Sequence, residues 1–192
     1  MNPFDKLKSR VSAFPDVDLS QGRSIAYSRS VTSRMMELMD GNAHGNVHGG
    51  TIMRMVDEAA AVVAIKHGRR PVVTASVERF DFLAPAYIGN VVHVDCCMTY
   101  VGRTSMEVGV EVTAEDLVTG EVRNIASSYV IYVALDENGK PTPVPPLVPA
   151  NAEETARIEQ ARIRRMHRQL VDEEMAKMRS DTPSQLTSDQ EK

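Results

Sequence analysis

The residues best suited to chemistry lie in one stretch, residues 42–66, which opens with a polar, glycine-rich loop and continues as an apolar segment. The apolar part contains three acidic or basic residues close together. Arg54 and Glu58 are spaced i,i+4 and can pair with each other, whereas Asp57 has no evident partner nearby. A buried carboxylate must find a partner or take up a proton. Asp57 is therefore either a structural residue that bonds across the fold or a reactive group in a functional site.

The loop before this segment, residues 42–50, offers Asn42, two histidines and a Gly-Gly pair. Asn42 suits a turn as well as it suits a site. His44 and His48 are four residues apart, a spacing that metal sites use, but only Asp57 is available to join them. We therefore expect no metal site.

The segment that carries Asp57 is predicted to be a helix over residues 50–66. Apolar and small residues from Ile52 to Ile65 fall all round the helical wheel, which predicts a helix buried on every side. Its charged residues exclude a membrane span. Gly68 and Pro71 end the helix.

The rest of the chain to residue 149 is rich in β-branched residues and short turns. We predict a first strand within residues 24–38 and four more strands at 72–83, 91–101, 105–115 and 122–135, with a bulge in the second near Glu78 or Arg79. The strand at 105–115 alternates apolar and polar residues, as a half-buried antiparallel strand does. Short connections favour one antiparallel sheet curled around the helix, an α+β fold. Such a sheet leaves an edge and an outer face uncovered, which favours a dimer or a larger assembly.

The C-terminal region begins with a proline-rich linker at 141–149 and continues as a second helix. Asn151 is the predicted N-cap, and the five arginines from Arg157 to Arg168 are interpreted as a solvated face. The predicted organisation is a leader at 1–20, one domain at 21–149, the helix at 150–179 and a disordered tail at 180–192.

Composition excludes several classes of function. The 192 residues carry a net charge of −4, which gives no indication of a nucleic-acid partner. The start of the chain lacks the apolar run of a signal peptide, and its two cysteines, Cys96 and Cys97, are adjacent, so a disulfide framework is not expected. We expect a cytoplasmic protein without a membrane partner.

Two motifs together resemble a known family. The run GNVHGGTIMRMVDEA, followed by VTASVERFDFLAPAYIGN, closely resembles the hotdog-fold acyl-CoA thioesterases, with YciA-type and brain-type acyl-CoA hydrolases as the nearest kin. The resemblance covers residues 24–149 and a similar charged C-terminal helix. It implies a hotdog fold, hydrolysis of acyl-CoA to fatty acid and CoA, and a homodimer at minimum, with a homohexamer (a trimer of dimers) as the full assembly.

The resemblance also assigns roles to residues in the glycine-rich loop and the helix. Asp57 matches the family's acidic residue and would act as general base or as nucleophile. The backbone N–H of Gly50 would stabilise the oxyanion at the helix N-terminus. Asn42 matches an asparagine that works with the acid of the opposite subunit, and His48 has a supporting role. No metal or organic cofactor is implied, because CoA is part of the substrate.

The CoA moiety carries phosphates, which basic residues at the mouth of the site should meet. The short connection formed by Arg103, Thr104 and Ser105 is the first choice, because relatives place similar loops near CoA, and Arg79 is a weaker candidate. Met53, Met55 and Met98 would line an acyl tunnel or pack in the core.

Three other functions share this fold. A hydratase or dehydratase pairs a catalytic histidine with an acid in a different arrangement, a non-catalytic acyl-CoA sensor needs a DNA-binding appendage, and a scaffold needs a decayed site. The Asp seven residues after the Gly pair favours hydrolysis over hydration, the sequence shows no helix-turn-helix or strongly basic domain for a sensor, and the intact set of Asn42, Gly50 and Asp57 argues against a scaffold.

Overall fold

The computed structural model describes residues 14–181 of the chain. The first 13 residues of the predicted leader and residues 182–192 of the predicted tail lie outside this range. The elements, in order, are α2 (Ile25–Ser28), β1 (Ser30–Met35), the 3₁₀ turn η1 (Leu38–Asp40), α3 (Gly49–Gly68), β2 (Val72–Phe82), β3 (Val91–Val101), β4 (Ser105–Glu115), β5 (Val122–Ala134) and α4 (Ala152–Asp181).

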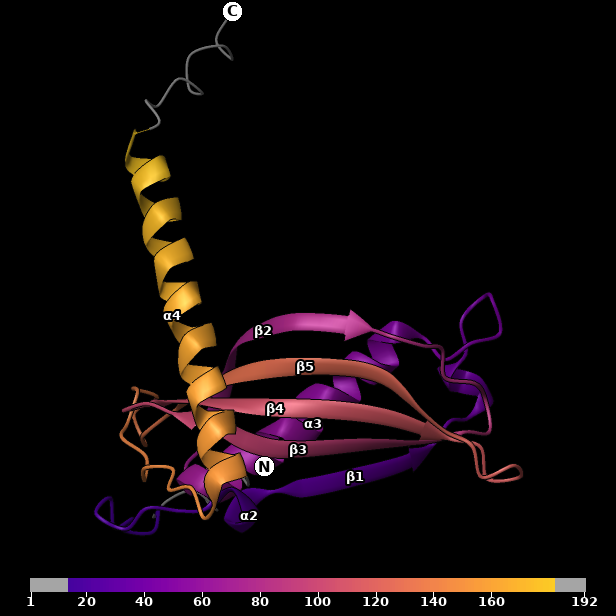
Figure 1. Ribbon diagram of the computed structural model, residues 1–192, viewed down its shortest axis with the longest axis horizontal. Coiled ribbons are helices and arrows are strands. Elements are labelled where there is room, and N and C mark those ends of the chain that lie inside the picture. Colours follow the sequence, from indigo (N-terminus) through magenta and orange to yellow (C-terminus); the bar gives the residue numbers. More distant parts are fainter. Residues whose placement is uncertain (1–13, 182–192) are drawn as a thin grey trace, which may run out of the picture.

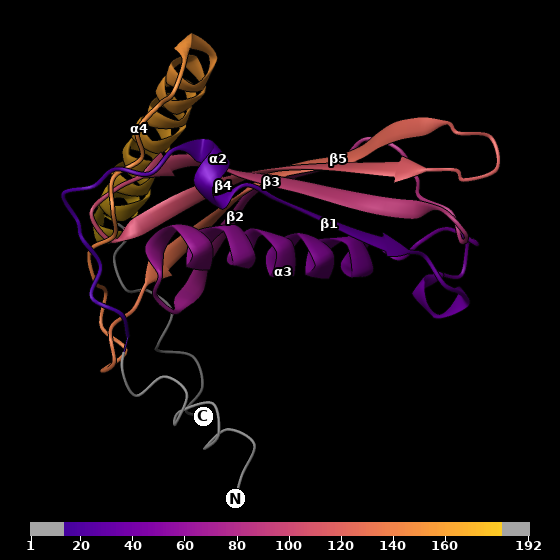
Figure 2. The same ribbon diagram turned by 90° about the horizontal axis from the view of Figure 1, so that it is seen from below.

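The five strands form one antiparallel sheet in the order β1-β3-β4-β5-β2 (Figure 1). The long helix α3 lies along one face of this sheet, and α4 crosses the other face (Figure 2). The predicted α+β hotdog architecture with an additional C-terminal helix is therefore confirmed. β1 and β2 are the two edge strands.

Helix α3 has well-defined ends. The side chain of His48 caps its N-terminus, and Arg69 closes its C-terminus in a left-handed conformation with a φ of 50°. One face of the helix packs on the sheet, through residues that include Val56, Ala60 and Val63.

The opposite face of α3 is open, with Met53 43%, Val62 43% and Ile65 46% exposed. The prediction of a helix buried on every side is therefore wrong for the single chain, because one curled sheet covers only one side of it.

Strand β2 is irregular at two places. Its register against β5 shifts between Thr74 and Ser76 and again between Glu78 and Asp81, where Arg79 has a φ of 45°. The second shift confirms the predicted bulge. The outer edge of β2 pairs with no strand among residues 14–181.

Helix α4 covers the outer face of the sheet through a buried ion-pair cluster. Glu107 of β4 is only 1% exposed, and its carboxylate accepts from Arg164 Nη2 at 2.7 Å and Arg168 Nη1 at 3.1 Å. The helix begins as predicted, with Asn151 Oδ1 accepting from the Glu154 amide at 2.8 Å. The expected solvated face is wrong for Arg164 and Arg168, whose acidic partner lies on the sheet, whereas Arg162 is exposed and pairs with Glu159 of its own helix.

Two smaller features bear on the sequence-based expectations. Cys96 is buried and Cys97 is half-buried, and both are free thiols. Burial raises the pKa of Cys96 to about 12. Among residues 14–181, no helix combines the length and the apolar character needed to cross a membrane.

Candidate active site

Asp57 projects from the open face of α3 and is held by two strands. Thr74 of β2 donates its hydroxyl proton to Asp57 Oδ1 at 2.8 Å. The Tyr132 hydroxyl, from β5, lies 2.8 Å from the Asp57 carbonyl oxygen and 3.2 Å from Oδ1. Both side-chain hydrogen bonds therefore go to Oδ1, and within the described residues none goes to Oδ2. One carboxylate oxygen is fixed and the other is open.

The Tyr132 hydroxyl is a permanent donor in this arrangement. Burial, the negative charge of Asp57 and the hydrogen bond to it all raise the pKa of Tyr132. The phenol therefore stays protonated at physiological pH and keeps Asp57 in a fixed orientation.

Asp57 is exposed in the single chain, contrary to the expectation of a buried carboxylate. It lies on the same open face of α3 as Met53, one turn earlier. The expected pairing of Arg54 with Glu58 is confirmed, at 2.8 Å between Nε and Oε1.

The N-terminus of α3 holds the second group of candidates. The Gly50 amide donates to His48 Nδ1 at 3.0 Å, so in this state the predicted oxyanion donor is engaged by the predicted supporting histidine. Gly50 and His48 are both exposed.

Asn42 lies in the loop that precedes α3. Its Oδ1 accepts from the backbone amides of His44, at 2.9 Å, and Asn46, at 3.2 Å. This is the turn geometry that the sequence allowed as an alternative. It fixes the side chain through its oxygen and leaves the amide nitrogen to donate elsewhere.

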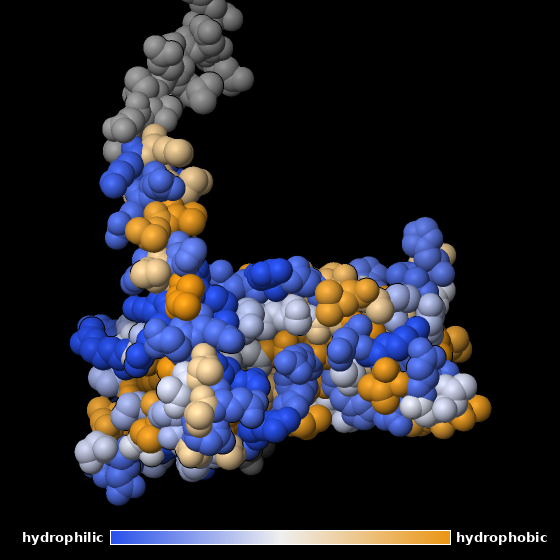
Figure 3. Space-filling model, in the orientation of Figure 1, coloured by the Kyte–Doolittle hydropathy of each residue, from blue (hydrophilic) through white to orange (hydrophobic). Residues whose placement is uncertain are grey.

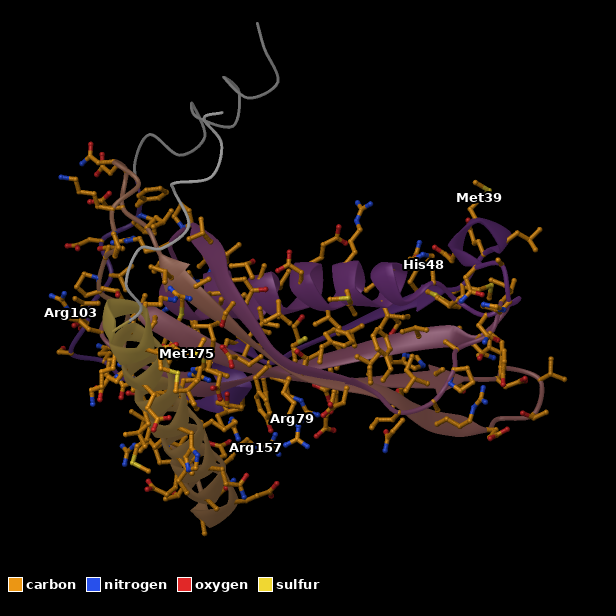
Figure 4. The ribbon with its side chains drawn as sticks, turned by 90° about the horizontal axis from the view of Figure 1, so that it is seen from above. Met39, His48, Arg79, Arg103, Arg157 and Met175 are labelled. Atoms are coloured by element: carbon orange, nitrogen blue, oxygen red, sulfur yellow. The ribbon has the colours of Figure 1, made fainter. Side chains whose placement is uncertain are left out.

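The predicted CoA-binding residues do not come together with the α3 N-terminus in one chain. Arg103 and Thr104 lie in the turn between β3 and β4, and Ser105 is the first residue of β4. Figure 4 shows Arg103 and His48 at opposite ends of the molecule. Arg79 lies on the other side of the sheet from α3 and pairs with Asp81 at 2.9 Å (Figure 4).

The methionines proposed for an acyl tunnel separate in the structure. Met55 and Met98 are buried in the core, and Met53 remains on the open face of α3. Within residues 14–181, no three His, Cys, Asp or Glu side chains gather as a metal site would require.

Thr74 and Tyr132, which bond Asp57, were not among the residues predicted from the sequence. Both lie in strands whose alternation marks them as ordinary members of a face, and neither forms a local motif with Asp57. The sequence did contain one signal for Thr74: a polar residue on the side of β2 that faces the helix, where it can meet the lone carboxylate of Asp57.

Comparison with known proteins agrees with this architecture. Residues 44–121 match the family model of the thioesterase superfamily. The chain is 46% identical over 123 residues to the acyl-CoA thioester hydrolase YkhA of Bacillus subtilis, which covers 64% of this chain and 71% of that protein. It is 36% identical over 141 residues to the cytosolic acyl coenzyme A thioester hydrolase of Rattus norvegicus, covering 72% of this chain but only 37% of that longer protein.

Two solved structures are similar over nearly their whole length. An apo-hexameric acyl-CoA thioesterase superposes with a TM-score of 0.76 at 38% identity, covering 79% of this chain and 97% of that one. The acyl-CoA hydrolase of Staphylococcus aureus, solved with butyryl coenzyme A, coenzyme A and coenzyme A disulfide, gives a TM-score of 0.73 at 32% identity, covering 84% and 100%. The open carboxylate on α3, the sheet that holds it and these similarities lead to one conclusion: the chain belongs to the acyl-CoA thioester hydrolases of the thioesterase superfamily.

Proposed function

We propose that this enzyme hydrolyses acyl-CoA thioesters at a site shared by two copies of the chain, with Asp57 of one copy facing Gly50 and Asn42 of the other. The observation that carries the proposal is the carboxylate of Asp57, which is fixed through Oδ1 by Thr74 and Tyr132 and open at Oδ2. A carboxylate held in this way suits proton abstraction from water or direct attack on a thioester carbon.

The separation of Asp57 from Gly50 supports a shared site. The two residues are seven positions apart on one helix, which corresponds to about 10 Å along its axis. A base and an oxyanion donor that act on the same carbonyl must both lie about 3 Å from the reacting atoms. One chain cannot meet this requirement, whereas two α3 helices packed antiparallel bring Asp57 of each close to Gly50 of the other.

Two open surfaces favour this pairing. The exposed apolar side chains of α3 and the unpaired edge of β2 both need cover. Asp57 is bonded to Thr74 on that edge strand, so it lies where a second copy would join the sheet. The same pairing would bring the β3–β4 turn of one copy, with Arg103, towards the α3 N-terminus of the other. Arg103, Thr104 and Ser105, with Arg79 as a weaker candidate, remain our proposed contacts for the CoA phosphates.

Spacing in a relative supports the roles of three residues. Three variants of the Staphylococcus aureus hydrolase replace an Asn, an Asp and a Thr by Ala. In that chain the Asp follows the Asn by 15 positions, and the Thr follows the Asp by 17. Asn42, Asp57 and Thr74 have the same separations here. We therefore assign Thr74 to the site as the residue that positions Asp57.

The proposed chemistry begins when the thioester carbonyl displaces His48 as the acceptor of the Gly50 amide. Asp57 then takes a proton from a water that Asn42 orients, the water oxygen bonds to the carbonyl carbon, and the C–S bond breaks to release the CoA thiolate. In the alternative route, Asp57 attacks the carbonyl carbon itself, and water hydrolyses the resulting mixed anhydride. Incorporation of ¹⁸O from labelled water into Asp57 during turnover would identify the second route.

The direct test is release of free CoA, followed with a thiol reagent over acyl-CoAs of increasing length. We expect the wild type to turn over and Asp57→Ala to lose on the order of 10²-fold or more in kcat, the effect of removing a base. Glu58→Ala, the next residue and an exposed carboxylate paired with Arg54, is the matched control and should keep its activity. Acyl-CoA binding without turnover in the wild type would instead indicate a sensor, and hydration of an enoyl-CoA would indicate a hydratase.

The assembly and location are proposals of the same kind. Hexameric relatives support a homo-oligomer, and we propose a dimer as the catalytic unit within a trimer of dimers. The cytoplasmic location remains a prediction, supported by the name of the rat relative.

A further inference from the structure

The first half of α4 is fixed in direction by the sheet beneath it. Ile158 and Ala161 are buried, and the Arg164 guanidinium bonds Glu107 while stacking over the Tyr129 ring at 3.7 Å. Farther along, Arg168 reaches Glu78 of the edge strand β2, at 4.0 Å.

The second half of α4, from residue 169, projects beyond β2 and away from the body of the molecule (Figure 1). These 13 residues would extend about 20 Å. The apolar side chains of this half are largely exposed, whereas most helical stability in proteins comes from packing an apolar face. We therefore expect a surface that covers it.

One face of this projecting helix is suited to burial. Leu170 and Val171 are 55% and 57% exposed and continue the line of Ile163, which is 48% exposed. With His167 and Glu174 they follow the spacing i, i+4, i+7, i+8, i+11, which places all five on one side of a helix. Figure 3 shows apolar residues on α4 surrounded by polar ones.

We propose that this face packs against the same face of a second copy, with the two α4 helices antiparallel and related by a two-fold axis between Leu170 and Val171. The pattern is self-complementary about that point. Leu170 would meet Val171 of the partner subunit, and His167 would meet Glu174 of the partner subunit, where an imidazole and a carboxylate can hydrogen-bond. A symmetric dimer requires this kind of self-matching surface.

Charge and position favour a second copy as the occupant. The acidic run Asp172–Glu174 follows the five arginines of residues 157–168, so antiparallel helices place the acids of each beside the end of the arginine run of the other. The helix leaves its own sheet at the free edge of β2, where a second copy would extend the sheet. Its symmetry axis, two to three residues beyond Arg168, therefore lies beside that edge.

Disulfide trapping tests the proposed pairing in the full-length chain. His167→Cys and Glu174→Cys are introduced separately in a Cys97→Ser background, and the two variants are refolded together and oxidised. We expect a covalent dimer between unlike chains as the main product. Each variant alone should stay largely uncrosslinked, because like positions would lie about 10 Å apart along the axis.

A second pair of variants tests the same face without cysteine. Leu170→Asp combined with Val171→Asp should weaken association of the copies by about tenfold or more in sedimentation, since four carboxylates would meet at the axis. Gln169→Asp, on the opposite side of the same turn, is the matched control and should leave association unchanged.

Efficient trapping of either variant with itself would overturn the proposed pairing. Absence of the covalent dimer between unlike chains would also overturn it, and would mean that α4 packs on another surface, such as the sheet of the partner. Adding Asp57→Ala to both cysteine variants should leave the yield of the covalent dimer unchanged, so the result is independent of the proposed chemistry.

Discussion

The proposed reaction depends on how the carboxylate of Asp57 is held. Asp57 receives hydrogen bonds from Thr74 and Tyr132 on the same oxygen, which leaves the other oxygen for water or substrate. In the proposed site Thr74 acts through Asp57, as a positioning residue. A hydrogen bond to a charged group contributes about 1.5–3 kcal/mol, enough to affect a reaction that depends on orientation.

Thr74→Val should therefore lower kcat by roughly tenfold with little change in KM, because it removes the hydrogen bond while keeping the shape of the side chain. Thr74→Ser should restore most of the rate. Steady-state CoA release measures both, and Thr113→Val, at a half-buried threonine of β4, serves as the control. Equal kcat in Thr74→Val and wild type would remove Thr74 from the site.

Sequence proposed Asp57 because a lone carboxylate in an apolar segment is conspicuous, and proposed Asn42 and Gly50 through resemblance. It did not point to Thr74 or Tyr132, because their contacts with Asp57 depend on which faces of two strands meet the helix. The first register shift in β2, between Thr74 and Ser76, helps to determine which side chains of β2 face the helix. The alternation of residues did not predict this shift.

At the scale of elements, α4 is attached to the sheet through Glu107. This side chain is 1% exposed and bonds Thr99, Arg164 and Arg168. Sequence placed Glu107 on the polar side of an alternating strand and the arginines on a solvated helix. Both predictions failed for the same reason. Glu107 is 57 and 61 residues away from Arg164 and Arg168, and neither the strand pattern nor the helix pattern indicates that the helix would cover the strand.

Glu107→Gln should lower the free energy of unfolding by about 3 kcal/mol, since breaking a buried ion pair leaves its partners uncompensated. The estimate is at the low end because Arg164 and Arg168 keep 26% and 24% of their side chains in solvent. Urea unfolding followed by circular dichroism measures the change. Glu111→Gln, at an exposed position on the same strand, should change stability little, and a similar loss in both variants would contradict the role of the cluster.

His67, at the end of α3, makes stability depend on pH. Its ring is buried, Nε2 lies 3.0 Å from the Pro145 carbonyl oxygen, and burial lowers its pKa below the ordinary value of 6.5. The unfolded chain therefore binds a proton at pH values where the native state does not. Stability from this group is intact above pH 6.5 and falls as pH drops below it, by up to about 1.4 kcal/mol per pH unit.

Denaturant unfolding between pH 7.5 and pH 5 tests this dependence. We expect the loss of stability on acidification to be smaller in His67→Gln than in wild type, even if the variant is less stable throughout. His44→Gln, at an exposed loop position, should follow the wild-type curve. Parallel curves for wild type and His67→Gln would show that the imidazole does not carry the effect.

For the whole molecule, the proposed site needs two copies of the chain. Helix α3 has an open apolar face, the edge of the sheet beside Asp57 pairs with no strand among residues 14–181, and the groups proposed for the reaction lie too far apart within one chain. Sequence predicted a helix surrounded by protein, and the single chain covers only one side of it. That prediction becomes compatible with the structure if a second copy supplies the missing cover.

Complementation between two inactive chains tests the shared site most directly. Asp57→Ala and Asn42→Ala chains are co-expressed with different affinity tags, and the mixed oligomer is purified through both. If each site takes Asp57 from one chain and Asn42 from the other, one site of every mixed dimer is intact. Random mixing makes about half of the dimers in a hexamer mixed, so CoA release should recover to about a quarter of the wild-type rate. If each site lies within one chain, the mixed dimer should be no more active than its two parents, and that result would contradict the account.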